Sequence, residues 1–123
     1  MKKLTIMAMI LLLSACAGPT PQEAARADYG DYPLNYEAIV RAYHRTYLKD
    51  PDTVQYSGFS YPQQLFVGNM FSGTKYGFGV CVTYNARNSY GGYVGVRTDA
   101  VLIRNGVVLD YLPNGRNGAF QFC

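Results

Sequence analysis

Few side chains in this sequence are suited to covalent chemistry, because it has one histidine, His44, and three cysteines. A nucleophilic site needs a base, and His44 is the only imidazole that could act as one. Helical spacing predicts that His44 lies on the solvent side of a helix, beside Arg41 and Arg45. We therefore predict no catalytic residue, and a protein that is not an enzyme.

Cys81 and Cys123 are the two thiols in the part of the chain expected to fold. An oxidising compartment would allow them to form a disulfide, closing a loop of about forty residues and stabilising the fold by about 3 to 4 kcal/mol in the chain-entropy model. The alternative is a buried, unpaired Cys81 and a loose Cys123. Neither is predicted to be a reactive nucleophile, since no base adjoins it in the sequence.

The sequence also gives no good candidate for a metal site, a phosphate-binding loop or a pair of catalytic carboxylates. The sequence has no Cys-x-x-Cys and no second histidine, and the stretch Gly91 to Gly95 lacks the lysine of a phosphate-binding loop. Asp99 and Asp110 fall on neighbouring predicted strands, where like charges on an exposed sheet face account for them. We predict no metal and no cofactor.

The first sixteen residues have the layout of an export signal. Lys2 and Lys3 precede an apolar run, Leu4 to Leu13, that is about half as long as a membrane-spanning helix. Leu13-Ser14-Ala15-Cys16 resembles the lipobox of bacterial lipoproteins. The resemblance implies a signal peptide at 1–15 and lipidation of Cys16 by diacylglycerol and an acyl chain such as palmitate. Ala17 then implies the outer membrane, with the domain facing the periplasm.

The composition of the remaining chain is typical of one small domain without a basic surface. The formal net charge is +3, but Lys2 and Lys3 of the signal supply two of these charges. We therefore predict no nucleic-acid partner. Twelve tyrosines and thirteen glycines favour strands and tight turns. The tyrosines have two interpretations: packing within a small sheet, or a dedicated binding surface.

Prolines and periodicity divide the beginning of the chain into a tether and a helix. Residues 16–34 contain three prolines and no sustained apolar period, which predicts a flexible tether after the lipidated cysteine. Apolar residues at helical spacing predict a helix from Asn35 to about Leu48, with Asn35 as its N-cap. Asp50-Pro51 must end that helix, because proline disfavours helical geometry in the residue before it.

The rest of the chain alternates with the period of β-strands. The clearest strand is Lys75 to Tyr84, and Asn105-Gly106 predicts a hairpin turn. Phe120 and Phe122 predict a short edge strand or a tail folded back over the core. The single domain, residues 35–123, is therefore predicted to be α+β, with one N-terminal helix packed on a small antiparallel meander.

Polar residues gather in the connection that follows the clearest strand. Turn chemistry alone accounts for them, since asparagine tolerates left-handed backbone and glycine supplies positive φ. The other interpretation is a binding tip that contacts a partner or a glycan. The candidate residues of this tip are Asn85, Arg87, Asn88, Tyr90 and Tyr93.

The segment Cys81 to Gly95 resembles a family of small exported bacterial proteins of unknown function. In that family a strand with the pattern Cys-x-x-x-Asn-Ala-Lys/Arg-Asn runs into Gly-Gly-Tyr-x-Gly. The resemblance covers roughly residues 36–111 and implies a shared fold, but it carries no activity.

These features predict a membrane-anchored lipoprotein with a structural or protein-interaction role in the bacterial envelope. Its partners would be the membrane, through the lipid, and an envelope protein. The alternative is an envelope domain that binds a small ligand or a glycan, with or without hydrolysis.

Overall fold

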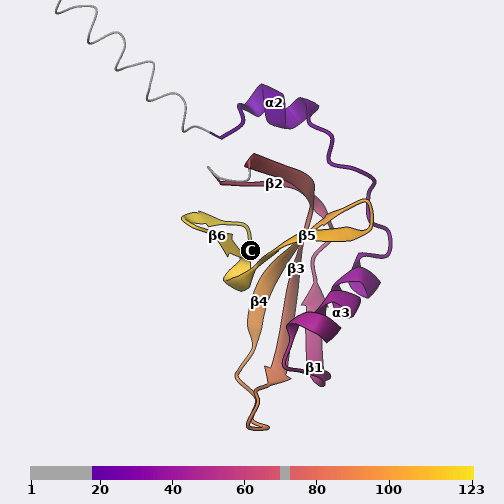
Figure 1. Ribbon diagram of the computed structural model, residues 1–123, viewed down its shortest axis with the longest axis vertical. Helices are drawn as coiled ribbons and strands as arrows, with labels where there is room; N and C mark the ends of the chain where they lie inside the picture. The colour runs from indigo at the N-terminus through magenta and orange to yellow at the C-terminus, as the bar shows by residue number, and fades with distance from the viewer. Residues whose placement is uncertain (1–17, 70–72) are drawn as a thin grey trace, which may run out of the picture.

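The computed structural model describes residues 18–69 and 73–123 and shows an α+β protein, as predicted (Figure 1). The predicted signal peptide and Cys16 lie outside these ranges. In the described ranges, no helix is long and apolar enough to cross a membrane. The elements are α2 (Pro21–Arg26), α3 (Tyr36–Tyr47), β1 (Asp50–Phe59), β2 (Gln63–Asn69), β3 (Gly73–Arg87), β4 (Arg97–Arg104), β5 (Val107–Leu112), the 3-10 turn η2 (Pro113–Gly115), β6 (Arg116–Asn117) and β7 (Phe120–Gln121).

The long strand β3 is the centre of an antiparallel sheet with the order β1-β3-β4-β5. β1 and β2 lie end to end along one edge of β3, beside residues 82–87 and 73–79 respectively. At the break between them, the Ser60 N–H donates to the Cys81 carbonyl, and the Ser60 hydroxyl accepts from the Cys81 N–H, both at 2.8 Å. The edge of the sheet beside β3 is therefore formed by two short strands and not by one continuous strand.

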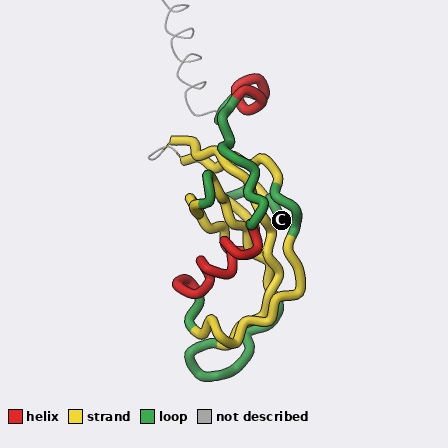
Figure 2. The backbone as a smooth tube through the Cα atoms, turned by 90° about the vertical axis from the view of Figure 1, so that its right-hand side faces the viewer, coloured by secondary structure: helices red, strands yellow, loops and turns green. Residues whose placement is uncertain are grey.

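Helix α3 covers one face of the sheet (Figure 2). It occupies almost the predicted range and ends before Pro51. Asn35 stands at the N-cap position, but its side chain makes no capping hydrogen bond. Val40 of α3 packs there on buried residues that alternate along β3 and β4: Val80, Val82, Tyr84, Ala86, Val101 and Ile103.

The C-terminal tail folds back over the opposite face of the sheet. There Phe122 packs on a second cluster, formed by Leu65, Val67, Ala100, Leu102 and Leu112. Gly79 makes room for the ring, because a Cβ at this position would lie 2.8 Å from ring atoms of Phe122. β6 and β7 form the small hairpin that leads the chain into this contact.

The chain before α3 differs from the flexible tether predicted for residues 16–34. Within its described part, α2 begins with a capping box, and the Tyr29 ring is buried edge to face against Tyr76, with centroids 5.5 Å apart. Arg104 binds both the carbonyl and the carboxylate of Asp28, the latter at 3.0 Å. Residue spacing did not predict this packing, because the partners lie on strands far along the chain.

The turn between β4 and β5 is the predicted Asn-Gly hairpin. Asn105 and Gly106 both have positive φ, 49° and 77°, as the common two-residue hairpin turn requires. Arg104 pairs with Val107 next to the turn, and the register then shifts by one residue between Ile103 and Leu102, so that Tyr111 lies opposite Val101.

Candidate functional site

His44 is buried, so the prediction that it lies on the solvent side of the helix is wrong. Its side chain is 1% exposed and sits between two tyrosine hydroxyls, with Nδ1 2.8 Å from Tyr56 Oη and Nε2 2.8 Å from Tyr111 Oη. His44 follows Val40 by one helical turn and therefore shares its face toward the sheet. The hydroxyls that satisfy the imidazole come from β1 and β5.

Asp99 is also buried, at 0% exposed, which overturns the expectation of a carboxylate on an exposed sheet face. Its Oδ2 accepts hydrogen bonds from the hydroxyls of Tyr84 and Tyr111, both at 2.6 Å. Its Oδ1 accepts from Arg97, through Nε at 3.1 Å and an Nη at 2.9 Å, and from the Asn114 N–H at 2.8 Å. Five donors thus stabilise one buried negative charge.

The donors and acceptors fix the protonation of this cluster. Because the Tyr111 hydroxyl donates to Asp99, its oxygen accepts from His44, which places the imidazole proton on Nε2 and leaves Nδ1 to accept from Tyr56. Burial lowers the pKa of His44 to about 4, so the ring is neutral at pH 7. Burial also raises the pKa of Tyr84 to about 12 and keeps its hydroxyl protonated.

Hydrogen bonding keeps Asp99 ionised despite its position. Burial alone would raise the pKa of this carboxyl, but the hydrogen bonds from Tyr111, Tyr84, Asn114 and Arg97 outweigh burial and hold the pKa below its ordinary value. Across the described residues, no buried side-chain nitrogen or oxygen lacks a partner. The cluster therefore holds α3, β3, β4 and β5 together, and it orients Arg97 and Tyr84.

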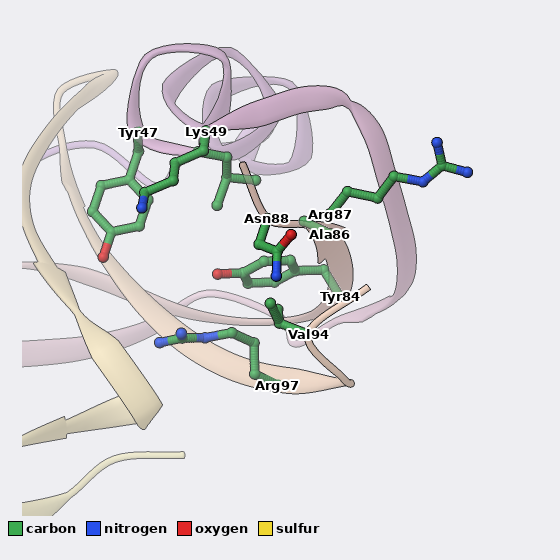
Figure 3. A pocket seen from close by; sticks show the side chains of 9 residues that line it. Tyr47, Lys49, Tyr84, Ala86, Arg87, Asn88, Val94 and Arg97 are labelled. Atoms are coloured by element: carbon green, nitrogen blue, oxygen red, sulfur yellow. The ribbon is translucent and has the colours of Figure 1, made fainter. Parts of the chain in front are cut away.

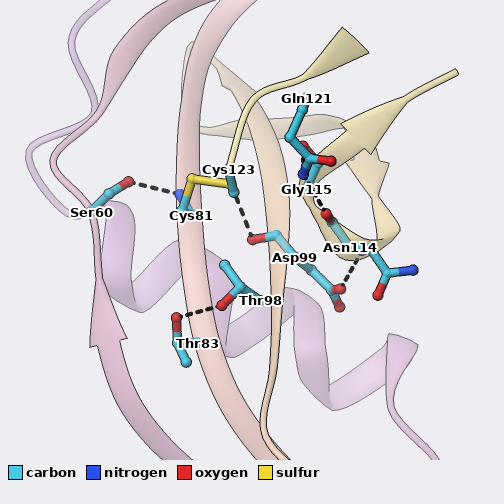
Figure 4. The surroundings of a disulfide bond; sticks show 9 residues. All are labelled: Ser60, Cys81, Thr83, Thr98, Asp99, Asn114, Gly115, Gln121 and Cys123. Atoms are coloured by element: carbon cyan, nitrogen blue, oxygen red, sulfur yellow. Dashed lines mark hydrogen bonds between the residues drawn. A yellow bond between two sulfur atoms is a disulfide. The ribbon is translucent and has the colours of Figure 1, made fainter. Parts of the chain in front are cut away.

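Cys81 and Cys123 form a disulfide, the first of the two alternatives that the sequence allowed (Figure 4). Their Cα atoms are 6.0 Å apart, and the bond fastens the C-terminal residue to the middle of β3. Gly115 lets the chain end pass, because a Cβ at this position would overlap the Cβ of Cys123. Neither sulfur is a free thiol in this structure.

The five residues predicted to form a binding tip lie together at the end of β3 and in the connection that leads to β4, but they make different contacts. Asn88 Oδ1 accepts from the N–H groups of Tyr90 and Gly92, at 2.9 and 3.2 Å, and Asn85 Oδ1 accepts from that of Gly95 at 3.2 Å. These asparagine side chains therefore stabilise the turn, which was one of the two interpretations.

The remaining tip residues are aromatic or cationic and lie at the surface. The Arg87 guanidinium stacks 5.1 Å from the centre of the Tyr93 ring, and the Tyr93 hydroxyl donates to the Thr53 carbonyl at 3.3 Å. Tyr90 is 96% exposed and points into solvent. Turn hydrogen bonds thus explain the two asparagines. They do not explain why an aromatic side chain, Tyr90, is exposed here.

A cleft of about 310 Å³ lies between the end of α3 and this connection (Figure 3). We call it the tip cleft. It is lined by Tyr47, Leu48, Lys49, Tyr84, Ala86, Arg87, Asn88, Val94 and Arg97.

Two residues of the predicted tip, Arg87 and Asn88, line this cleft. Other lining residues were not singled out in the sequence. Lys49 follows the helix, Arg97 begins β4, and the Tyr84 ring forms part of the wall. A cation directly after a predicted helix and another at the start of a predicted strand were visible in the sequence, but their meeting depends on the fold.

No trio of histidine, cysteine, aspartate or glutamate that could hold a metal ion is found in the part of the chain that the structure describes. In comparisons with known proteins, no family model, no curated protein and no solved structure matches this chain.

Proposed function

We propose that this chain is a lipoprotein anchored to the bacterial outer membrane through Cys16, and that its domain binds another envelope component without catalysing a reaction. The basic start, the short apolar run and Leu13-Ser14-Ala15-Cys16 support export and lipidation. Ala17 after the cysteine supports sorting to the outer membrane. Resemblance of residues 36–111 to small exported proteins supports the same address.

The observation that carries the binding role is the position of the tip. The described chain starts beside α2, and the connection between β3 and β4 lies at the opposite end of the molecule (Figures 1 and 2). A lipid at the N-terminus would therefore leave this end free to meet a partner. Tyr90, Val94 and Val96 are exposed there, and tyrosine is enriched in protein interfaces.

The partner that fits this surface best is a protein. Tyr90 offers a rigid aromatic anchor of the kind that dominates interface energies, while hydrogen bonds from the backbone to Asn88 and Asn85 hold the connection in one shape. A preorganised loop loses little entropy when it binds.

The tip cleft favours a second candidate, a small-ligand or glycan-binding domain. Its volume, about 310 Å³, falls at the lower end of the range for small-molecule sites, and Tyr47 and Tyr84 supply aromatic surface. A ligand-binding domain would keep its affinity for a purified ligand when no other protein is present.

Capture from crosslinked envelopes tests the proposed function. Tagged chain, its Cys16→Ser variant and its Tyr90→Ala variant would be purified from fractionated membranes and analysed by mass spectrometry. We expect one envelope protein to be recovered in constant ratio with the lipidated chain and lost with both variants. Sedimentation of the Cys16→Ser variant with the outer membrane would contradict the anchor. Unchanged capture by Tyr90→Ala would contradict the tip as the binding surface.

A further inference from the structure

We propose that the tip cleft binds a carboxylate carried by a segment of the partner protein, with one apolar side chain of that segment beside it. This inference rests on the proposed function, because it names the chemistry by which the same surface would recognise its partner.

Two cationic side chains bring hydrogen-bond donors to the cleft. Figure 3 shows Lys49 and Arg97 on opposite sides of the Tyr84 ring, while Arg87 points away. Asp99 accepts from two of the five N–H groups of Arg97, which leaves three for another acceptor. The four ion pairs found among the described residues do not include Lys49.

Asn88 adds a third donor, and its orientation is set by the turn. Because its Oδ1 accepts from two backbone N–H groups, the other end of the amide, Nδ2, is turned toward Val94 and Tyr84 (Figure 3). A flipped amide would place two donors against the N–H groups of Tyr90 and Gly92. The turn therefore aims an N–H₂ group into the cleft.

The charges select a carboxylate over a cation or a dianion. Among the described residues, no aspartate or glutamate lines the cleft, so a cation would find no acidic side chain there. The buried Asp99 balances the charge of Arg97, and the Arg87 side chain points away from the cleft and stacks on Tyr93. Lys49 is therefore the one uncompensated cation that faces the cleft. A single negative charge matches it, whereas a phosphate dianion would carry one charge too many.

The apolar part of the lining sets what must accompany the carboxylate. Leu48, Ala86 and Val94 contribute aliphatic surface, and a volume of about 310 Å³ has room for a carboxylate and one apolar side chain. An acidic residue next to leucine or valine, or a chain end with such a residue last, supplies both groups.

Titration of the full chain, purified in non-ionic detergent, with matched peptides tests this inference. The first pair is N-acetyl-alanyl-leucine and its amide, which tests a chain end. The second is N-acetyl-alanyl-glutamyl-leucine amide and its glutamine counterpart, which tests a side chain. We expect at least one acid to bind about tenfold more tightly than its uncharged partner, and the better acid identifies the source of the carboxylate.

Two variants place the binding in the cleft. Asn88→Asp keeps the acceptor oxygen that the turn needs but replaces the N–H₂ with a negative charge, and Lys49→Gln removes the uncompensated cation. We expect each to weaken acid binding about tenfold or more. Arg45→Gln, which removes an equal charge from the last turn of α3 outside the cleft, should bind as the parent does.

Equal binding of acids and uncharged partners, no binding of either acid, binding of inorganic phosphate as tightly as of the acids, or acid binding unaffected by both cleft variants would each overturn the inference. If the inference fails while an envelope protein is still captured and lost with Tyr90→Ala, the proposed function stands without it. If capture fails as well, both are wrong.

Discussion

The hydroxyl of Tyr111 donates a 2.6 Å hydrogen bond to the buried carboxylate of Asp99. The same oxygen accepts from His44, so β4, β5 and α3 meet at one atom. Asp99 also fixes Arg97 at the tip cleft, through an Nη 2.9 Å away. The interior of the domain thus positions a side chain at its proposed binding surface.

Asp99→Asn should be among the most destabilising single changes in the domain. An amide cannot accept from both tyrosine hydroxyls and also from Arg97, so donors that are now paired would face the amide N–H₂. The carboxylate is fully buried although Arg97 is 37% exposed, and each buried donor left without its acceptor costs about 1 to 3 kcal/mol. Urea unfolding followed by circular dichroism measures the free energy of unfolding.

Asp110→Asn is the matched control, because Asp110 is a partly exposed carboxylate 3.7 Å from Lys75 on the surface. Its replacement should change the free energy of unfolding by less than about 1 kcal/mol. Equal losses for the two variants would show that the buried hydrogen bonds do not stabilise the fold.

His44 should make the domain less stable as the pH falls from about 6.5 to about 4. In the folded chain its pKa is lowered to about 4, whereas an unfolded histidine has its ordinary value of 6.5. Between these values the unfolded chain binds a proton that the folded chain does not. The contribution is therefore complete above pH 6.5 and falls by at most about 3 kcal/mol as the pH drops to 4.

The His44→Gln variant isolates this effect from the titration of carboxylates. It should be less stable than the parent at pH 7, and the difference between the two should shrink as the pH falls through that window. Free energies of unfolding at several pH values measure it. A difference that stays constant from pH 7 to pH 4 would mean that His44 titrates normally in the folded chain.

Loss of the disulfide should destabilise the domain by about 3 to 4 kcal/mol, since the bond closes a loop over a sequence separation of 42. The double variant Cys81→Ser/Cys123→Ser should unfold at lower urea than the parent and should be insensitive to a reductant. The reduced parent should approach the double variant. A parent whose unfolding is unchanged by reductant would contradict the bond.

Gly115→Ala should be more destabilising than Gly118→Ala, although both glycines have positive φ, 66° and 56°. Both variants pay about 1 kcal/mol for left-handed backbone. Only at Gly115 would the new Cβ also overlap Cys123, whereas Gly118 has no atom within 4 Å of that position. Thermal melts of the two variants should therefore differ, and coincident melts would show that the tail is not packed where the structure has it.

Local patterns predicted the helix, the central strand and the Asn105-Gly106 turn, because each depends on residues close in the sequence. The same patterns missed the packing of Tyr29 and the burial of Asp99, since their partners come from distant strands. The sequence did contain two signals for the burial of His44 and Asp99. His44 lies one helical turn after the buried Val40, and Asp99 directly precedes the fully apolar run Ala100 to Ile103.

The tip cleft was predicted only in part. Asn88 and Arg87 were singled out because asparagine and glycine cluster near them, but Lys49 and Arg97 reach the same place only when α3 lies across the sheet. Residue spacing cannot predict that arrangement, because it depends on how α3 packs on the face of the sheet.

The central claim, that the tip binds an envelope partner, is tested most directly by photo-crosslinking in intact cells. A photoreactive phenylalanine analogue would replace Tyr90 in one strain and Tyr61 in another; Tyr61 is also exposed but lies between β1 and β2. We predict that position 90 gives one covalent adduct with an envelope protein, that position 61 does not, and that Asn88→Asp reduces the adduct. Crosslinking from position 61 and not from position 90 would contradict the account.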